Sequence, residues 1–197
     1  MNTVKETTRV SQTINKSEFI CTLIPINDYD DAVNKLNKIR KEFHDATHNC
    51  YAIVWGENGE YAKNSDDGEP SQTAGVVIMN VLKQNNLTNV MAVVTRYFGG
   101  IKLGAGGLVR AYSSSTALAV KEAIIQEIIK LSTIEIKTNY ANINNVLKEI
   151  DRIKATIIRK DFYEDIVLKV ELPTDSINSL KDSLIEITKG NVIINIL

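Results

Sequence analysis

The chain has 197 residues, of which 44% are hydrophobic and 24% are charged, which indicates a globular protein of one large or two small domains. Its 23 basic and 24 acidic residues leave a formal net charge of −1, which excludes a protein that coats nucleic acid through bulk positive charge. The apolar runs are too short to cross a bilayer, the N-terminal residues lack the apolar core of a signal peptide, and two cysteines make no disulfide framework. These features predict a cytoplasmic protein without a membrane partner.

The first two thirds of the chain alternate between short apolar strands and amphipathic helices. Strands are expected at 9–14 and 18–26, joined at Asn15-Lys16, and again at 50–55, within 56–64, and at 89–95. Helices are expected at 28–43, 74–86 and 106–125. The acidic segment 66–75 contains glycine and proline and is therefore expected to be a loop.

The last third of the chain follows a different order of elements. Strands are expected at 131–140, 155–163, 165–173 and 191–197, with helices at 142–150 and 175–188. This β-α-β-β-α-β order is typical of a ferredoxin-like domain. We therefore expect an α+β protein with two domains, residues 1–130 and 131–197.

The stretch "VTRYFGGIKLGAGGLVRAY" carries half of the ten glycines, between an expected strand and an expected helix. Glycine permits positive φ and close approach of a ligand, while the free N–H groups of a helix start attract anions. We therefore predict an oxyanion site, formed by a phosphate-binding set of glycines and cations, with the helix beginning at Gly106 or Gly107. The set is Arg96, Gly99, Gly100, Lys102, Gly104, Gly106, Gly107 and Arg110.

The spacing of these glycines matches no standard phosphate motif. Val109 stands where G-x-G-x-x-G requires its third glycine, and Ala105 stands where a P-loop requires lysine. The alternative interpretation is a tight crossover in which the glycines allow a helix to pack closely on the sheet.

The segment "FHDATHNC" places His44 and His48 four residues apart, as in a zinc-protease helix. The acid between them is Asp45 rather than glutamate, and the expected helix gives way to a strand at this point. Cys50 is the one candidate for a third ligand. We therefore predict no metal site and no cofactor, and interpret the two histidines as polar residues at a helix–strand junction.

The loop "NSDDGEPSQT" brings together three carboxylates, those of Asp66, Asp67 and Glu69. Such a group can hold Mg²⁺, form ion pairs with Arg96 and Arg110, or perform acid–base catalysis if one carboxyl is buried. The alternative is a solvated acidic turn at the start of the next helix, where negative charge is favourable.

Together, the glycine-rich stretch, "DDGEPSQTAG" and "HDATHNCYA" resemble the signature of the IMPACT/YigZ family, in its bacterial two-domain type, and the resemblance covers essentially the whole chain. It implies an N-terminal α/β-sandwich domain similar to the ribosomal S5-like fold and to domain IV of the translocation elongation factor, and a ferredoxin-like C-terminal domain. Its eukaryotic members act in translational control. One departure is "SQTAG", where the family has "SGTAG", and we expect Gln72 to take ordinary φ and ψ.

Two functions remain open. The favoured one is a binding protein that engages RNA, the ribosome or a translation factor through the Arg96–Arg110 surface. The other is an enzyme acting on a phosphorylated or anionic small substrate, with candidates His44, His48, Asp66, Asp67 and Glu69. A closed pocket around Arg96 and His48 would favour the enzyme, whereas an open groove ringed by lysine and arginine would favour binding. In both cases we expect the three motif blocks to converge; the sequence leaves the oligomeric state open.

Overall fold

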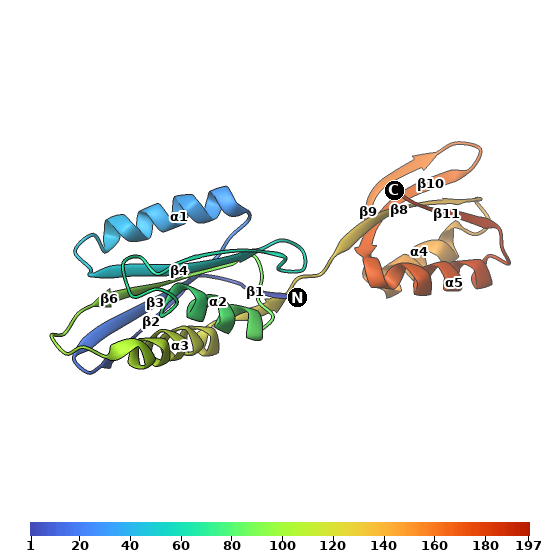
Figure 1. The fold of residues 1–197 in the computed structure, drawn as a ribbon. Helices are drawn as coiled ribbons and strands as arrows, with labels where there is room; N and C mark the ends of the chain where they lie inside the picture. Colours follow the sequence, from blue (N-terminus) through green and yellow to red (C-terminus); the bar gives the residue numbers. More distant parts are fainter. The chain divides into compact units, whose positions relative to one another are not determined.

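The chain folds into two compact units, Met1–Ile128 and Ile129–Leu197. The structure is a computed structural model that describes residues 1–197, and Figure 1 shows its fold. The first unit is built on a five-stranded antiparallel sheet of order β2-β3-β6-β4-β5. Its strands are β2 (Thr8–Ile14), β3 (Ser17–Pro25), β4 (His48–Trp55), β5 (Tyr61–Ser65) and β6 (Val90–Tyr97).

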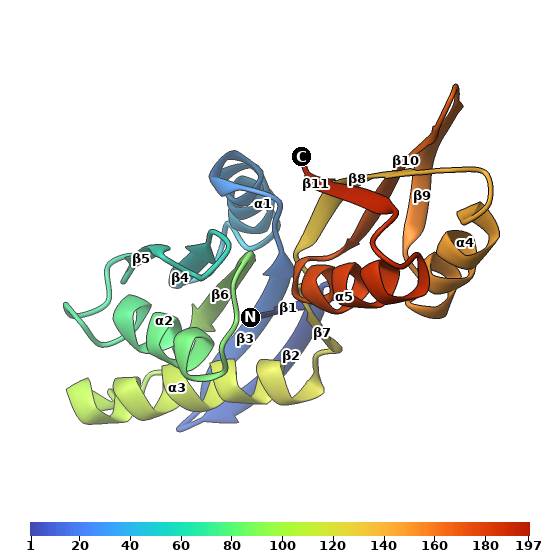
Figure 2. The same cartoon turned by 90° about the vertical axis from the view of Figure 1, so that its right-hand side faces the viewer.

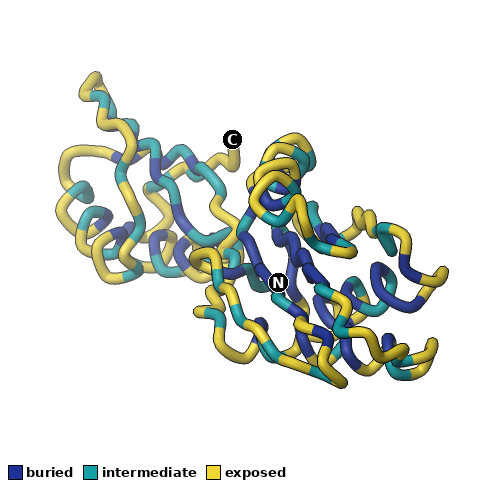
Figure 3. Tube along the Cα trace, turned by 90° about the vertical axis from the view of Figure 1, so that its left-hand side faces the viewer, coloured by how far each residue is buried: buried dark blue, intermediate teal, exposed yellow.

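Strand β6 is apolar over most of its length because it lies in the middle of the sheet, with a core on each face. Val90, Ala92 and Val94 belong to one buried cluster, and Met91 and Val93 belong to the other. This alternation follows from the two-residue period of a strand. Figure 3 shows the buried positions concentrated along the strands of this sheet.

Three helices cover the sheet of the first unit: α1 (Tyr29–Glu42), α2 (Gly75–Gln84) and α3 (Gly104–Glu122). Helix α1 lies on one face, and α2 and α3 pack side by side on the other (Figures 1 and 2). The side chain of Asp28 caps α1 by accepting a hydrogen bond from the N–H of Asp31 at 2.7 Å. No helix of the protein is both long and apolar enough to cross a membrane.

Helix α3 begins at Gly104, so the predicted start at Gly106 or Gly107 was wrong. Leu103 packs against the core of the unit, and this contact anchors the chain one turn earlier than the glycine content suggested. The helix also ends at Glu122, three residues before the predicted end.

Residues beyond α3 form a short strand that the sequence did not predict. Strand β7 (Ile125–Glu127) pairs antiparallel with β1 (Asn2–Val4), which includes the first residues of the chain. Strands of three residues are too short to show a period-two pattern, so neither could be recognised from sequence.

Gly99 fixes the position of the glycine-rich loop against the β2–β3 hairpin. The hairpin turns at Asn15 and Lys16, which have φ of 46° and 64°. A Cβ added to Gly99 would lie 1.8 Å from the carbonyl oxygen of Lys16. Gly99 is therefore required for backbone packing, which bears out the packing interpretation at this position.

The second unit has the predicted β-α-β-β-α-β order, with a short 3₁₀ turn before its second helix. The four antiparallel strands have the order β11-β8-β10-β9, and α4 and α5 pack together on one face of the sheet (Figure 1). The elements are β8 (Leu131–Thr138), α4 (Ile143–Arg152), β9 (Thr156–Phe162), β10 (Ile166–Pro173), η1 (Thr174–Ser176), α5 (Ile177–Ile187) and β11 (Val192–Ile196).

Gly99 and Gly106, both in the glycine-rich stretch, should respond oppositely to replacement by alanine. Gly99→Ala should lower the free energy of unfolding of the first unit by more than about 3 kcal/mol, because the backbone must move to accept the methyl group. Gly106 lies in α3 with open space where a Cβ would be. Gly106→Ala should therefore raise the free energy of unfolding by about 0.5–1 kcal/mol. Urea unfolding followed by the fluorescence of Trp55, the single tryptophan, measures both. A harmless Gly99→Ala would contradict the packing role.

Candidate functional site

The three motif blocks meet at one end of the first unit because neighbouring strands carry two of them. His48 opens β4 and lies directly across from Arg96 in β6. The loop after β5 supplies Glu69, whose carboxylate contacts both: Oε1 is 2.6 Å from Nη1 of Arg96, and Oε2 is 3.9 Å from Nε2 of His48. The predicted convergence therefore holds for these three residues.

Glu69 and Arg96 form a buried ion pair. Their side chains are only 3% and 6% exposed. Oε1 of Glu69 also accepts a hydrogen bond from the hydroxyl of Tyr112 at 2.8 Å, while Nη2 of Arg96 donates to Oγ of Ser17 at 3.4 Å. The pKa of Tyr112 is raised, mainly by burial and further by the neighbouring Cys50 and Glu69. Its phenol therefore stays protonated and can donate.

Arg96 is not the exposed cation that the glycine-rich stretch suggested. Its guanidinium carbon lies 5.4 Å from the ring centres of both Phe19 and Phe98, and its charge is compensated by Glu69. A compensated, buried guanidinium contributes little long-range attraction for an anion. Its Nε, however, is buried and has no hydrogen-bond partner.

The position of His48 determines which ring nitrogen carries the proton. Nδ1 lies 2.8 Å from the backbone carbonyl oxygen of Asp67, and a carbonyl oxygen can only accept. Nδ1 is therefore the donor, and in the neutral ring Nε2 keeps its lone pair. Nε2 lies 3.9 Å from Oε2 of Glu69, so the neutral ring presents an acceptor nitrogen on this side of the site.

Asp66 and Asp67 organise the loop rather than the site. Asp66 accepts hydrogen bonds from the backbone N–H groups of Gln72, Ala74 and Gly75. Partial burial acts to raise the pKa of Asp66, but these three donors together outweigh it, and the pKa is lowered. Asp67 accepts from the N–H of Asn49 at 2.7 Å and pairs with Arg40. Neither carboxylate lines the cavity described below.

Gln72 takes a left-handed conformation with φ of 64°, so the expectation of ordinary φ was wrong. The physical reason is the carboxylate of Asp66, which accepts the N–H of Gln72 at 2.9 Å and holds the turn in the conformation that a glycine would adopt. The side chain at this position is exposed, so a long polar residue fits without a clash.

Cys50 lies beneath this network, with Sγ 2.9 Å from the carbonyl oxygen of Asp66 and 3.3 Å from the hydroxyl of Tyr112. Burial raises the pKa of the Cys50 thiol to about 12. A protonated, buried thiol is neither a nucleophile nor a metal ligand at neutral pH. His44 is exposed beyond the end of α1 at Glu42, so the two histidines do not share a helix face. No group of three potential metal ligands occurs in the protein.

A cavity of about 450 Å³ opens above the ion pair. Its polar wall includes His48, Glu69, Arg96 and Thr47, and its other wall is the end of the glycine-rich loop with the start of α3. Lys102 lies on this wall and is exposed, and no side chain caps the helix at Leu103. The full lining is Thr47, His48, Glu69, Pro70, Arg96, Phe98, Lys102, Leu103, Gly104, Ala105 and Leu108.

The predicted anion-binding residues do not share one site. Arg96, Lys102 and Gly104 line the cavity, whereas Gly107 and Arg110 line a separate hollow of about 250 Å³ beside Asn15 and Ser114. Gly100 and Gly106 have open space around them and line neither.

Sequence reasoning missed the side chains that complete the site. Tyr112 belongs to the same glycine-rich stretch, eight residues beyond the start of α3, and only the turn of the helix brings it under Glu69. Ser17 and Phe19 come from β3, in a segment without any recognisable motif. Leu103 and Leu108 provide apolar wall, and no polar signal marks them.

The fold and the site together define a two-unit α/β protein with a cavity above a buried ion pair at the end of its first sheet. Residues 15–120 match the family described as "Impact N-terminal domain". The chain is 37% identical to the "IMPACT family member YvyE" of Bacillus subtilis over 95% of its own length and 87% of the relative's. It is 30% identical to the "IMPACT family member YigZ" of Escherichia coli over 93% and 91%. The chain therefore belongs to the IMPACT family, as the three motif blocks indicated.

A eukaryotic relative matches just under half of this chain. "Protein IMPACT" of Rattus norvegicus is 36% identical over 47% of this chain, which is 30% of the rat protein. Among solved structures, the crystal structure of a hypothetical protein aligns over 100% of this chain and 96% of its own, with a TM-score of 0.67 and 28% identity. The likeness to this solved structure thus extends over the residues of both units.

Removing one partner of the buried pair should be far more damaging than breaking an exposed pair. Glu69→Ala leaves the guanidinium of Arg96 uncompensated and should lower the free energy of unfolding by about 3–5 kcal/mol. Glu42→Ala breaks the exposed pair with Arg9, where the side chains are 49% and 40% exposed, and should cost at most about 1 kcal/mol. Urea unfolding followed by Trp55 fluorescence compares them; equal losses would show that the Glu69–Arg96 pair is not buried in solution.

Replacing Gln72 with glycine should stabilise the loop. The left-handed conformation costs a non-glycine residue about 1–2 kcal/mol. The greater freedom of glycine in the unfolded chain offsets about 0.5–1 kcal/mol of this. Gln72→Gly should therefore raise the free energy of unfolding by about 0.5–1 kcal/mol. Ser71→Gly is the matched control, since Ser71 is exposed in the same loop without positive φ, and it should lose about 0.4–1 kcal/mol. Thermal unfolding distinguishes the two; a loss in both variants would refute strain at Gln72.

Proposed function

We propose that this protein is a cytoplasmic binding protein of the translation apparatus, which receives an anionic group of RNA, of the ribosome or of a translation factor in the cavity above the Glu69–Arg96 pair. The observation that carries the proposal is that the start of a 19-residue helix, an exposed lysine and the Glu69–Arg96 pair all border one cavity. The first N–H groups of a helix have no partner within the helix and carry a partial positive charge.

The chemistry of the cavity matches a phosphate that carries a ring. Lys102 and the first N–H groups of α3 supply positive charge and direction for the oxyanion. Phe98, which is 45% exposed and lines the same cavity, offers a face on which a base can stack. Arg96 acts as a fixed wall, because its charge is already compensated by Glu69.

Family membership supports the link to translation. The resemblance described above connects the eukaryotic members with translational control. We assign the first unit to the ribosomal S5-like and elongation-factor domain IV type, with the domain boundary at residues 130/131. The second unit is assigned to the ferredoxin-like type, on the support of its strand order β11-β8-β10-β9. Fold likeness to ribosome-binding modules is an argument by analogy, and the cavity provides the independent physical support.

A second candidate function is an enzyme acting on a small phosphorylated or anionic substrate. The specific observation in its favour is His48, whose Nδ1 is held by the carbonyl of Asp67 while Nε2 lies 3.9 Å from Glu69. A histidine held in one tautomer beside a buried carboxylate has the arrangement of a general base. The cavity is also lined by Arg96 and His48, the two residues around which a closed pocket was expected above for the enzyme.

Lys102→Ala and Arg110→Ala form a matched pair that tests where an anion binds. Lys102 lines the cavity and Arg110 lines the separate hollow, and both are exposed. Lys102→Ala should weaken binding of a ligand held in the cavity by roughly 1–3 kcal/mol, while Arg110→Ala should leave it unchanged. Calorimetric titration of orthophosphate, a nucleoside monophosphate and a short single-stranded RNA into each protein measures the difference.

Salt dependence separates the two functions in the same titrations. RNA bound along its backbone should lose affinity steeply as salt rises, since counterions are released on binding. A small ligand held by one lysine and backbone N–H groups should show a shallower slope. Absence of binding for all three probes, or equal affinity of wild type and Lys102→Ala, would refute anion binding in the cavity.

A further inference from the structure

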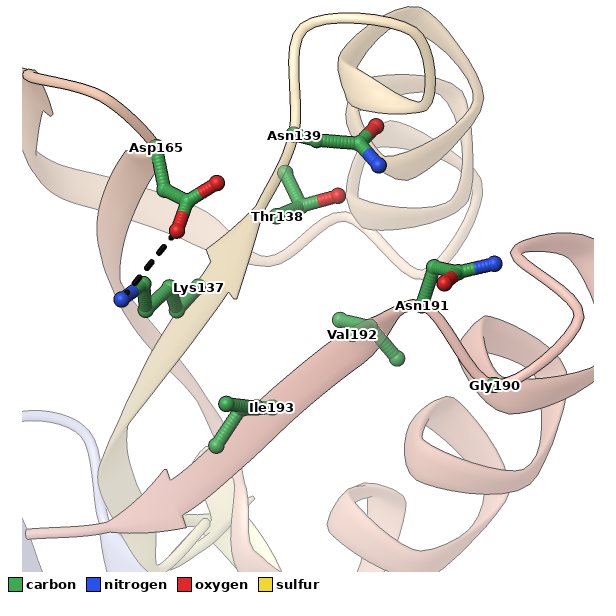
Figure 4. Close-up of a pocket in the computed structure, with 8 residues that line it drawn as sticks. All are labelled: Lys137, Thr138, Asn139, Asp165, Gly190, Asn191, Val192 and Ile193. Atoms are coloured by element: carbon green, nitrogen blue, oxygen red, sulfur yellow. Dashed lines mark ion pairs between the residues drawn. The ribbon is translucent and has the colours of Figure 1, made fainter.

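The second unit contains a pocket of its own, of about 300 Å³, at the end of its sheet. It lies where β8 ends, where β10 begins after Asp165, and where the chain enters β11 from the turn at Gly190 (Figure 4). No residue of this pocket belongs to the motif blocks of the first unit.

A buried hydroxyl marks this pocket as more than a surface hollow. Thr138 is 3% exposed, and its Oγ1 has no hydrogen-bond partner. An unpartnered buried hydroxyl is costly, and native structures contain few of them. In Figure 4 the hydroxyl is directed toward the space bordered by Asn139 and Asn191.

Hydrogen bonds on the outer side of the two asparagines fix which amide atom each one offers. Oδ1 of Asn139 accepts the N–H of Asn142 at 3.0 Å, which leaves the NH₂ of Asn139 as the free group. Nδ2 of Asn191 donates to the carbonyl of Thr188 at 3.0 Å, which leaves its Oδ1 as an acceptor. The pocket therefore presents one oriented donor, one oriented acceptor and a hydroxyl that can serve as either.

The electrostatics of the pocket favour an uncharged ligand. Its one cation and one anion, Lys137 and Asp165, pair with each other at 3.1 Å (Figure 4). Ile193 and Val192 supply apolar wall, and Ile193 is 56% exposed. The matching ligand carries an acceptor beside a donor on one edge and has an apolar face.

We propose that this pocket binds the edge of a nucleobase, with a carbonyl oxygen or ring nitrogen of the base accepting from the NH₂ of Asn139 and an N–H of the base donating to Oδ1 of Asn191. Bases combine adjacent donors and acceptors with a flat apolar face, and asparagine amides are among the side-chain groups that hydrogen-bond to such edges. This site is separate from the cavity of the first unit and does not depend on the function proposed for that cavity.

Uridine and 3-methyluridine test the donor–acceptor match in the full chain. Titration followed by NMR should show uridine shifting the amide signals of residues 138–139 and 190–193, whereas 3-methyluridine lacks the ring N–H and should bind about tenfold more weakly. Asn139→Asp keeps Oδ1 for the N–H of Asn142 but removes the NH₂ donor, and should weaken uridine about tenfold. Asn195→Asp makes the same change on β11 at an exposed position outside the pocket, and should leave the affinity unchanged.

Thr138→Val separates a binding role from a structural one. Because the hydroxyl has no partner, valine should raise the melting temperature of the protein while weakening uridine severalfold; a drop in melting temperature with unchanged affinity would assign the hydroxyl to folding and overturn the proposal. Equal affinity of uridine and 3-methyluridine, absence of uridine binding, or tighter binding of a simple carboxamide such as glutamine would also overturn it. A short oligouridylate that loses affinity in Asn139→Asp by the same factor as uridine would support it and extend it to single-stranded RNA.

Discussion

The buried ion pair of Glu69 and Arg96 holds the candidate site together. It joins the end of β6 to the loop before α2, and through Tyr112 and Ser17 it also reaches α3 and β3. Two charges so deep in the unit are tolerable only because each is hydrogen-bonded. This requirement constrains the loop, the strand end and the helix at once, and the cavity above them has walls from β4, this loop, the end of β6 and the start of α3.

The acidic loop shows how one cluster of like charges is divided into different tasks. Asp66 binds three backbone N–H groups, Asp67 binds a backbone N–H and Arg40, and Glu69 takes the buried arginine. Each carboxylate has its own donors, so the three need not share a proton or a metal ion. The chemistry left for a ligand lies with His48 and Lys102 and with the start of α3.

The fold was largely predictable because periodicity and turn residues act locally. The longer helices and strands of both units lie where their patterns indicated, and the βαββαβ order of the second unit was read from the sequence. The site was predictable only in part. Strand pairing decides which motif blocks meet, and it places His48 across from Arg96. A motif in the sequence does not show whether its side chains are buried. Arg96 therefore looked like a surface cation, and Arg110, from the same stretch, turned away from the cavity on the surface of α3.

The pairing of β1 with β7 has a consequence for the folding of the first unit. Asn2 pairs with Glu127 and also exchanges backbone hydrogen bonds with Asn86 and Thr88, so all of these partners of β1 lie far along the chain. Contacts between segments so far apart in sequence form late, because closing the long loop costs entropy before the contact is gained. Strand β1 is thus expected to join the first unit late in folding, and its pairing with β7 then closes the two ends of that unit on each other.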